Sequence, residues 1–396
     1  MKTGTNTLIA IWGTLLFSSC VPNNDTIVET PANDTVTPIA PIDTAVVEED
    51  VFTPNDWDRA SKMLAGIPVE HEFKIDSNYY SEYVDYITNE FTGIKEKRLD
   101  KLMSWKNDVV PQSDEEKLRK VFYPFSGGDF IHLYQLYPEA PNYLMLAIEP
   151  IGTLPDFNSL PVYDIDTALH ESKVMLRDIF FRSYFITKNM DSDIKKSKQI
   201  GGILPSILWG ISSSGHDIVS VENVSLSNNG DMSYTPAKLG ESFEQGVSVN
   251  FVEHGSKTLQ EVTYLSCDIS NKGFAKDTAI TALMTNLGDV NSFVKAASYL
   301  MHYRTFSEIR NVILNHSVVH IQDDTGIPFK YFDTEKSTIR LYGKYVTPVK
   351  DFSESLFQED LDSAYNNSSY YAGKLPFSMG YHWGSKDQNQ MVVLRK

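Results

Sequence analysis

The chain is poor in cysteine, with only Cys20 and Cys267 among 396 residues. An internal disulfide would need both of them, and the position of Cys20 points to a different use, described below. We therefore expect no internal disulfide, so the stability of the folded part has to come from a hydrophobic core. Roughly 345 residues follow residue 50, which predicts one large domain or two closely packed ones.

Long apolar runs are also scarce. The run from Leu8 to Phe17 covers ten residues, whereas a helix needs about 20 to cross a bilayer, so no segment is predicted to span one. Lys2, this short run and the small residues Ser18 and Ser19 follow one another in the order of a secretory signal peptide. We expect residues 1–19 to be removed on export.

The residues before the predicted cleavage point, Phe17-Ser18-Ser19-Cys20, resemble a bacterial lipobox, with Phe17 in place of the usual Leu. This resemblance implies that Cys20 carries lipid, palmitate included, and anchors the protein to a bacterial membrane, facing the periplasm or the cell surface. The alternative is an ordinary secretory cleavage beside a chance cysteine. The rarity of cysteine in this chain argues against chance.

Residues 21–50 lack lysine, arginine and aromatic residues, and all their charges are acidic. Such a segment buries too little apolar surface to offset its ordering entropy. We therefore interpret residues 20–50 as the lipidated cysteine followed by a disordered acidic tether.

Basic residues are few in the whole chain, 35 against 52 acidic ones, for a formal charge of −17. Loss of residues 1–19, whose one charged residue is Lys2, changes this to −18. That charge repels nucleic acid and anionic lipid, so no nucleic-acid partner is expected, and it favours a cationic ligand. Aromatic residues between 365 and 383 leave a glycan or peptide ligand open as well.

Two segments have the pattern of a strand, a helix and a second, parallel strand. The first runs from Val121 through a turn at 126–129 and a helix from Phe130 to a strand at 143–148. The second runs through 293–301, a helix at 306–315 and a strand at 318–321. They predict an α/β fold with a mixed sheet and two βαβ units.

Around these units we expect further elements. They are helices at 54–65, 76–91, 95–105, 277–285 and from Thr167 to about 189, strands at 218–226, 248–252 and 259–269, and antiparallel C-terminal strands at 337–345, 374–383 and 390–394. The similar order of features in the two βαβ units favours an internal duplication, with a first half at 51–270 and a second, intimately packed half at 271–396. The alternative is that any two βαβ units look alike at this level of detail.

The same units include Tyr123-Pro124-Phe125-Ser126-Gly127 with Asp129-Phe130, then Glu149-Pro150-Ile151-Gly152, and later Gln322-Asp323-Asp324-Thr325-Gly326-Ile327-Pro328. These segments look like signatures of an uncharacterised group of bacterial secreted or lipid-anchored proteins. The resemblance covers the chain from about residue 55 to its end. It implies no activity and assigns no role to any residue.

The turn Ser126-Gly127-Gly128, with Glu149 after the next strand, is a candidate binding site. Backbone N–H groups there could hold an anion, and an acid at that distance contacts a ribose in nucleotide-binding units. The pattern G-x-G-x-x-G is absent, and nucleotides are scarce outside the cytoplasm. A tight turn with a helix cap explains the same residues.

A serine hydrolase is the catalytic alternative, because Ser126, Asp323 and His382 follow one another in the chain order of α/β-hydrolases. Pro124 does not fit the sequence around such a nucleophile, and strands are missing before it. A second serine-rich loop at 210–217 has equally unsuitable spacing.

The pair Asp323-Asp324 follows a strand and could bind a cation or act as acid and base, or it could be a solvated turn. His316 and His320 are four residues apart, but on a strand this places them about 13 Å from each other, so no metal site and no cofactor are predicted.

We therefore expect a lipid-anchored binding or envelope-structural protein, with an extracytoplasmic hydrolase using Ser126 or the Asp323-Asp324 loop as the alternative. An enzyme should bring Ser126, Glu149 or Asp323 within hydrogen-bond reach of a histidine. We also expect the two acidic loops, 149–152 and 323–326, to lie at one edge of the sheet or to face each other across a cleft, where a shared acidic groove would prefer a cation or a basic ligand.

Overall fold

The computed structural model describes residues 52–70, 74–184, 197–350, 352–384 and 387–396. The predicted signal peptide, Cys20 and the predicted tether lie outside these residues. Among the helices that are described, none is both long and apolar enough to cross a membrane.

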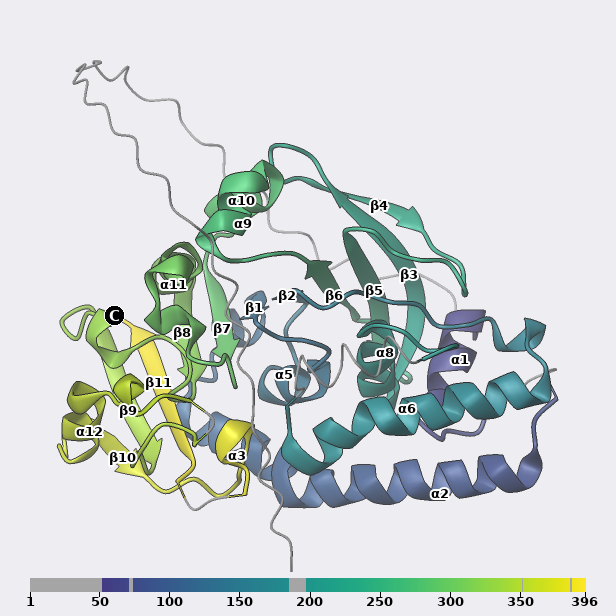
Figure 1. Ribbon diagram of the computed structural model, residues 1–396, viewed down its shortest axis with the longest axis horizontal. Helices are drawn as coiled ribbons and strands as arrows, with labels where there is room; N and C mark the ends of the chain where they lie inside the picture. Colours follow the sequence, from purple (N-terminus) through teal and green to yellow (C-terminus); the bar gives the residue numbers. More distant parts are fainter. Residues whose placement is uncertain (1–51, 71–73, 185–196, 351, 385–386) are drawn as a thin grey trace, which may run out of the picture. The chain divides into compact units, whose positions relative to one another are not determined.

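The predicted α/β fold with a mixed sheet is confirmed (Figure 1). The described strands form one 11-stranded sheet in the order β10-β9-β11-β8-β7-β1-β2-β6-β5-β3-β4. Their bounds are β1 (Val121–Pro124), β2 (Asn142–Ala147), β3 (His216–Leu226), β4 (Met232–Pro236), β5 (Gly246–Glu253), β6 (Leu259–Ser266), β7 (Val290–Val294), β8 (Ser317–Gln322), β9 (Ser337–Gly343), β10 (Tyr371–Gly373) and β11 (Asn389–Arg395).

The centre of the sheet is parallel. Strands β8, β7, β1, β2 and β6 are neighbours and all pairs among them are parallel. On one side β5, β3 and β4 continue the sheet with antiparallel pairing, and on the other side β11 is antiparallel to both β8 and β9. Because parallel strands point the same way, the carboxyl ends of the five central strands share one edge of the sheet.

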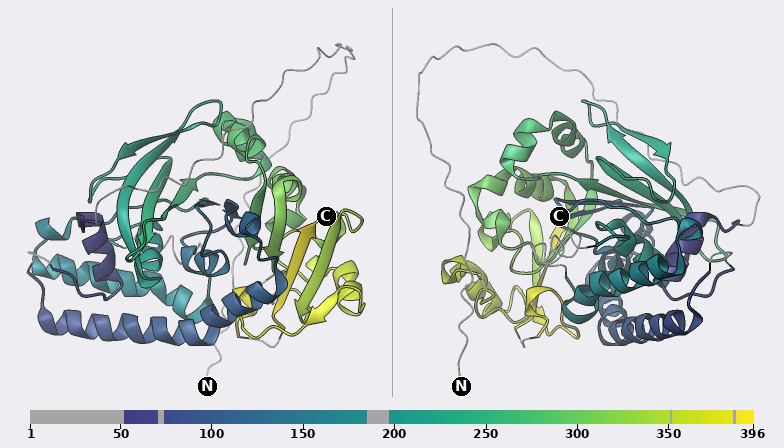
Figure 2. Two further views of the ribbon diagram at one scale, coloured as in Figure 1. Left: turned by 180° about the vertical axis from the view of Figure 1, so that it is seen from behind. Right: turned by 45° about the vertical axis from the view of Figure 1, so that its right-hand side comes forward.

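Helices cover both faces of this centre (Figure 2). Alternate residues of β1 show why: Tyr123 belongs to the core on one face, and Phe122 to the core on the other. The first face is covered by α1 (Asp56–Leu64), α2 (Ser77–Ile94), α3 (Asp100–Val109), α5 (Phe130–Leu136), α6 (Val162–Arg182) and α8 (Leu204–Ser213). The second face is covered by α9 (Asn271–Lys276), α10 (Thr278–Thr285), α11 (Ser307–His316) and α12 (Glu359–Tyr365).

The strands β1 and β7 are neighbours, and the chain moves outward from them in opposite directions, so that the order of strands across the sheet reverses between them. From β1 the chain passes through α5 on the first face to β2, and from β7 it passes through α11 on the second face to β8 on the opposite side. Open α/β sheets bind their ligands in the crevice beside such a reversal, at the carboxyl ends of the strands. Both predicted βαβ units are present, and a half-turn about an axis between β1 and β7 would superpose their topologies; a duplicated origin stays a prediction.

Several predicted helix boundaries are wrong. The long helix α6 begins at Val162 after Pro161, five residues before the predicted cap Thr167. Gly93 does not interrupt α2, because the helix continues through a π-helical turn, η1 (Lys95–Leu99), into α3. Thr305-Phe306-Ser307-Glu308 has the sequence of a capping box, which predicts Thr305 as the N-cap of the helix at 306–315. In the structure α11 begins at Ser307, and Asn271 of another segment accepts the hydrogen bond of Glu308 N–H.

Two strand predictions also need correction. Residues 374–383 contain no strand and end in a short 3-10 helix, η7 (Gly380–His382), and β4 and β10 were not predicted. In the region 374–383 the alternation reflects separate aromatic contacts, such as Phe377 against Trp105 and Tyr381 against Phe352, rather than a pleated strand.

Candidate functional site

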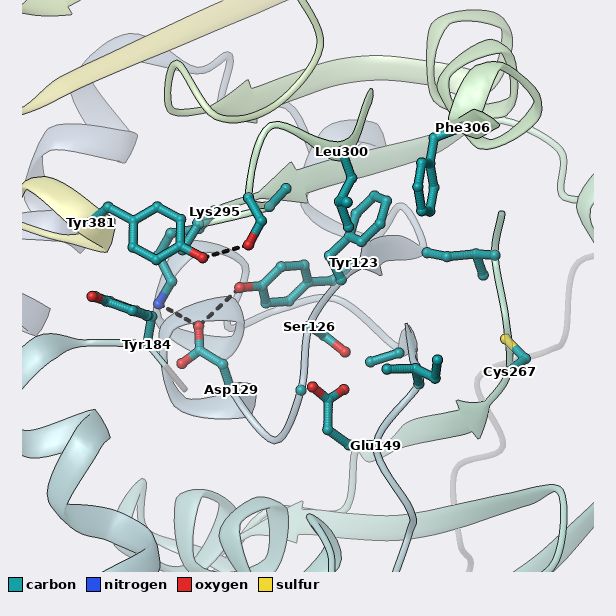
Figure 3. Close-up of a pocket in the computed structure, with 18 of the residues that line it drawn as sticks. Tyr123, Ser126, Asp129, Glu149, Tyr184, Cys267, Lys295, Leu300, Phe306 and Tyr381 are labelled. Atoms are coloured by element: carbon teal, nitrogen blue, oxygen red, sulfur yellow. Dashed lines mark hydrogen bonds and ion pairs between the residues drawn. The ribbon is translucent and has the colours of Figure 1, made fainter. Parts of the chain in front are cut away.

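A cavity of about 440 Å³ lies at the carboxyl ends of the central strands. Its walls come from the segments that follow β1, β2, β6 and β7, which is where the reversal of chain direction places a binding crevice. Figure 3 shows the charged and aromatic side chains that line it. Ser126, Gly127 and Glu149, three of the predicted binding residues, are among its lining residues.

The backbone is strained on both sides of the reversal. Phe125, directly after β1, has φ 61°, and Ala296, Ser298 and Tyr299 after β7 have φ of 52°, 53° and 56°. Residues other than glycine pay about 1–3 kcal/mol for such conformations, which persist only where surrounding contacts enforce them. Such strain is concentrated at binding and catalytic sites, and here it borders the cavity.

A buried charge cluster forms the deep wall of the cavity. The Asp129 carboxylate is 2.5 Å from Lys295 Nζ and 2.5 Å from His132 Nδ1, and it accepts a 3.0 Å hydrogen bond from the Tyr123 hydroxyl. Burial alone raises the pKa of Asp129, but the charges of His132 and Lys295 outweigh it and hold this pKa below its usual value. Burial lowers the pKa of His132 to about 4, so the ring is neutral at pH 7 and donates from Nδ1.

Two buried cations tie this cluster to the end of α6. Lys295 donates to the Ser183 carbonyl, and Arg98 donates to the Ile179 carbonyl at 3.2 Å. Positive charge beside the carboxyl end of a helix is favourable because the peptide dipoles leave partial negative charge there. Neither Lys295 nor Arg98 was predicted as a site residue; the signal for Lys295 was a single charge inside the apolar run 293–301.

The glycines of the turn after β1 have different roles. Gly127 lines the cavity with a φ of 51°. Gly128 packs against α8, where an added Cβ would lie 3.0 Å from Ser206 Cβ and 3.2 Å from the Ile203 carbonyl oxygen. The predicted anion cradle is therefore not an open one: the helix that follows has only seven residues, and its first turn is packed against protein.

Glu149 stands at the end of β2 and points its carboxylate into the cavity beside Ser126 (Figure 3). Its carbonyl accepts a 2.7 Å hydrogen bond from Tyr264. The loop behind it is fastened to residues 201–203, since Ile203 N–H donates to the Ile151 carbonyl at 2.9 Å. Gly152 has a φ of 79°, and a Cβ there would lie 1.6 Å from the Gly201 carbonyl oxygen, so this contact fixes the loop and with it Glu149.

Asp323 does not line the cavity itself, but it is bonded to Ala296, which does. Asp323 Oδ2 accepts a 2.9 Å hydrogen bond from Ala296 N–H, and Oδ1 accepts one of 2.5 Å from the Thr325 hydroxyl. Thr325 Oγ1 in turn accepts a hydrogen bond of 2.8 Å from Ala297 N–H. Burial and the charge of Asp324 raise the pKa of Asp323 to about 6.

Asp324 is enclosed by donors. It accepts hydrogen bonds from Tyr299 at 2.7 Å, from Asn389 at 3.0 Å and from His382 at 3.0 Å. Burial alone lowers the pKa of His382, but the bond to Asp324 and its charge raise it overall. The alternative of a solvated acidic turn is wrong, because Asp323 and Asp324 are buried.

The predicted hydrolase triad is not assembled. Ser126 Oγ donates to the Leu146 carbonyl at 3.4 Å, Asp323 is occupied by the turn after β7, and His382 is bonded to Asp324. His316 and His320 are also separate: His316 is bonded to the Gly288 carbonyl, and His320 lies between Ser292 and Gln322 inside the sheet. Among the described residues, no group of three or more metal-binding side chains comes together.

Aromatic side chains form the outer wall of the cavity. Tyr184 and Tyr381 meet edge to face with ring centroids 4.6 Å apart, and Phe352 packs on Tyr381 at 5.5 Å. The Tyr381 hydroxyl lies 2.6 Å from Ser298 Oγ, so this wall is joined to the strained turn. Of the aromatic C-terminal residues singled out in the sequence, Tyr381 alone lines the cavity.

The prediction that both acidic loops lie at one edge of the sheet is confirmed, because β2 and β8 are parallel members of the same sheet. Three strand spacings separate them, about 14 Å. Only Glu149 faces the cavity, so the two loops do not form a shared acidic groove. Comparison of the chain with protein-family models, with curated proteins and with solved structures found no match.

Proposed function

We propose that the protein is an extracytoplasmic, lipid-anchored binding protein, and that its ligand is a nucleoside without phosphates, held in the cavity between β1 and β7. The observation that carries this proposal is the Glu149 carboxylate, which enters the cavity from the end of β2. Glu149 follows Ser126, in the turn after β1, by twenty-three residues. An acid about 20 residues beyond that turn accepts hydrogen bonds from ribose hydroxyls in dinucleotide-binding folds.

The order of the strands supports a nucleoside. The parallel centre consists of β1, β2, β6, β7 and β8, and numbered one to five along the chain these strands lie in the order 3-2-1-4-5. This count leaves out the antiparallel strands β3, β4 and β5, and β11 takes the place beside β8 where a sixth parallel strand would lie. The order of the five parallel strands is that of dinucleotide-binding sheets, whose ligands lie across the reversal between strands 1 and 4. Fold similarity alone does not establish function, so the argument depends on the side chains.

The apolar part of the cavity suits a base. Ile269, Leu300 and Phe306 line the cavity, and Phe306 lies on the opposite side of it from Lys295 and Tyr184 (Figure 3). Asp268 is also a lining residue, and its carboxylate can accept a hydrogen bond from an amino group. Apolar walls with a small number of oriented polar groups are typical of small-molecule sites, and 440 Å³ is within their usual range.

The charges argue against phosphates. Asp129, Glu149 and Asp268 line the cavity, while Lys295 is the one basic residue among its described lining residues and is paired with Asp129. A neutral or positively charged nucleoside therefore fits better than a nucleotide.

Calorimetric titration with adenosine, S-adenosylmethionine, AMP, ATP and glucose tests this proposal. We expect adenosine or S-adenosylmethionine to bind and ATP to bind at least tenfold more weakly. Glu149→Gln should weaken binding of the nucleoside about 10–100-fold, because a hydrogen bond to a charged group contributes about 1.5–3 kcal/mol.

The matched control uses the ligand instead of the protein. Deoxyadenosine should lose affinity for the wild type but little further affinity for Glu149→Gln, if both changes remove the same contact. Asp231→Asn, an exposed carboxylate outside the cavity, should leave all affinities unchanged. Binding of glucose alone, or tighter binding of ATP than of adenosine, would refute the nucleoside proposal.

The anchor has its own test. Replacing Cys20 with Ser removes the acceptor of the lipid, so the protein should move from the membrane fraction to the soluble fraction after cell lysis and ultracentrifugation. Cys267→Ser is the matched control and should stay with the membranes. If the Cys20 variant still floats with membranes, the anchor is elsewhere in the chain.

A further inference from the structure

The turn at 295–299 forms the wall of the cavity that follows β7, and its shape is strained. Lys295, Ala296, Ala297 and Ser298 line the cavity, and three residues of the turn, Ala296, Ser298 and Tyr299, have positive φ without being glycine. At about 1–3 kcal/mol each, this strain requires contacts that hold the turn in place.

The side chains of Lys295, Ser298 and Tyr299 contact Asp129, Tyr381 and Asp324, whereas two backbone amides of the turn lead to Asp323. Asp323 Oδ2 accepts from Ala296 N–H at 2.9 Å, and Thr325, which donates to Asp323 Oδ1, accepts from Ala297 N–H at 2.8 Å. Thr325 N–H also donates to Oδ1, at 3.1 Å. Asp323 thus holds both consecutive amides of the turn, one directly and one through the Thr325 hydroxyl.

We propose that Asp323 is a latch for the ligand site: as a carboxylate it holds the turn 295–299 in its binding shape, and as a carboxylic acid it releases the turn. This inference concerns regulation of the site and rests on the proposed function for its ligand. Three hydrogens already point at the two carboxylate oxygens, and each of these bonds is strengthened by the negative charge of the carboxylate. A proton on either oxygen removes that charge and turns one acceptor site into a donor, so the hold on the turn weakens.

The surroundings make this proton available near neutral pH. Burial first, and then the charge of Asp324, raise the pKa of Asp323 to about 6. Asp323 is buried, and Gly380 packs so closely on it that an added Cβ there would lie 2.6 Å from its Oδ2. The other titratable groups that act on Asp323 from the elements packed around it are Tyr123, Lys295, Tyr299, Asp324 and His382.

The latch is tested first without ligand. In protein labelled with ¹⁵N-alanine, the amide resonances of Ala296 and Ala297 should shift between pH 7.5 and 5.5 with a midpoint near 6. Asp323→Asn should abolish this titration, because the amide takes up no proton in this range. Circular dichroism at each pH verifies that the chain is folded.

Binding provides the second measurement. Only protein molecules with an ionised Asp323 are expected to bind, and the ionised fraction falls about fourfold between pH 7.5 and 5.5. The apparent affinity for adenosine should therefore weaken about fourfold over this range. Thr325→Val, which keeps Asp323 but removes the hydroxyl, should weaken binding at pH 7.5, and Thr325→Ser should restore it. These two variants keep the proposal testable if Asp323→Asn does not fold.

The outcomes separate the two proposals. If adenosine and S-adenosylmethionine fail to bind at every pH while the alanine amides titrate near 6, the latch stands and the proposed ligand is wrong. If the amides do not titrate, or titrate equally in Asp323→Asn, the latch is wrong whatever binds in the cavity. Equal binding by Thr325→Val and Thr325→Ser would also contradict it.

Discussion

Replacing Lys295 with methionine should lower the free energy of unfolding by about 3–5 kcal/mol, because it leaves the buried Asp129 carboxylate without its cation. Methionine keeps most of the length of the side chain, so the loss reports mainly on the charge. The variant also frees the Ser183 carbonyl, which Lys295 ties to the cluster. Urea denaturation followed by circular dichroism measures the change.

The matched control for this variant is an exposed ion pair. Lys95→Met breaks the 2.6 Å ion pair between Lys95 and Asp100, two side chains that are each about half exposed. It should lower the free energy of unfolding by less than about 1 kcal/mol. Adding Asp129→Asn to Lys295→Met should recover part of the loss, because the uncompensated charge is then gone. A loss below 1 kcal/mol in Lys295→Met would mean that the buried pair contributes little to stability.

Acid should destabilise the fold strongly between pH 6.5 and 4. Burial lowers the pKa of His132, His302 and His320 to about 4 each, against about 6.5 in the unfolded chain. Within this window the unfolded state binds protons that the folded state does not, so the free energy of unfolding falls as pH falls. Each histidine contributes about 3 kcal/mol over the full window, a large share of the 5–15 kcal/mol typical of a domain.

Groups with a raised pKa work in the opposite direction. The largest effect is that of Asp323, whose pKa of about 6 means that the folded state takes up its proton first, which favours folding as pH falls from about 6 toward 4. The pKa values of Asp58, Asp166 and His382 are raised as well. We expect the three histidines, whose pKa values are all lowered to about 4, to outweigh these groups and leave a net loss. Urea titrations at several values of pH between 7 and 4.5 should show this slope.

The contribution of one histidine can be isolated. His320→Asn should reduce the slope near pH 5 by about 1.4 kcal/mol per pH unit, the value for one proton. His316→Asn makes the same substitution at a half-buried histidine four residues away and is the control for the change of side chain. Equal slopes in all three proteins would show that His320 takes up its proton as easily in the folded state as in the unfolded one.

The parts of the fold that could be predicted from the sequence are those with local signals. Both βαβ units have an apolar strand, a polar turn and a helix in close succession, and the helices predicted to start at Asp76 and Asp277 do have these side chains as caps. The predictions at Thr167 and Thr305 were wrong for a different reason. The helix α6 starts earlier, after Pro161, and at α11 Asn271 from a distant segment takes the place of a local cap.

The candidate site divides in the same way. Ser126, Gly127 and Glu149 were identified because they stand in a recognisable order around β1 and β2. Lys295 and His132 are separated by 163 residues, and no local pattern predicts that they meet. The acidic pair Asp323-Asp324 was noticed for its charge, but its role depends on which amides the fold brings to it, and these belong to another strand's turn.

The position of β11 has a consequence for how the sheet forms and fails. Among the described strands, β9 and β10 connect to the rest of the sheet through β11 alone, which lies between β8 and β9 (Figure 1). β9 and β10 can therefore join the sheet only after β11 has paired with β8, for example Met391 with Gln322. These residues are distant in sequence, and pairing between distant segments is slow. If β11 detaches, β8 and β9 each present an open strand edge at once, and exposed edges are where chains pair with one another and aggregate. The same strand that completes the sheet is thus the one whose delay or loss leaves the protein most prone to self-association.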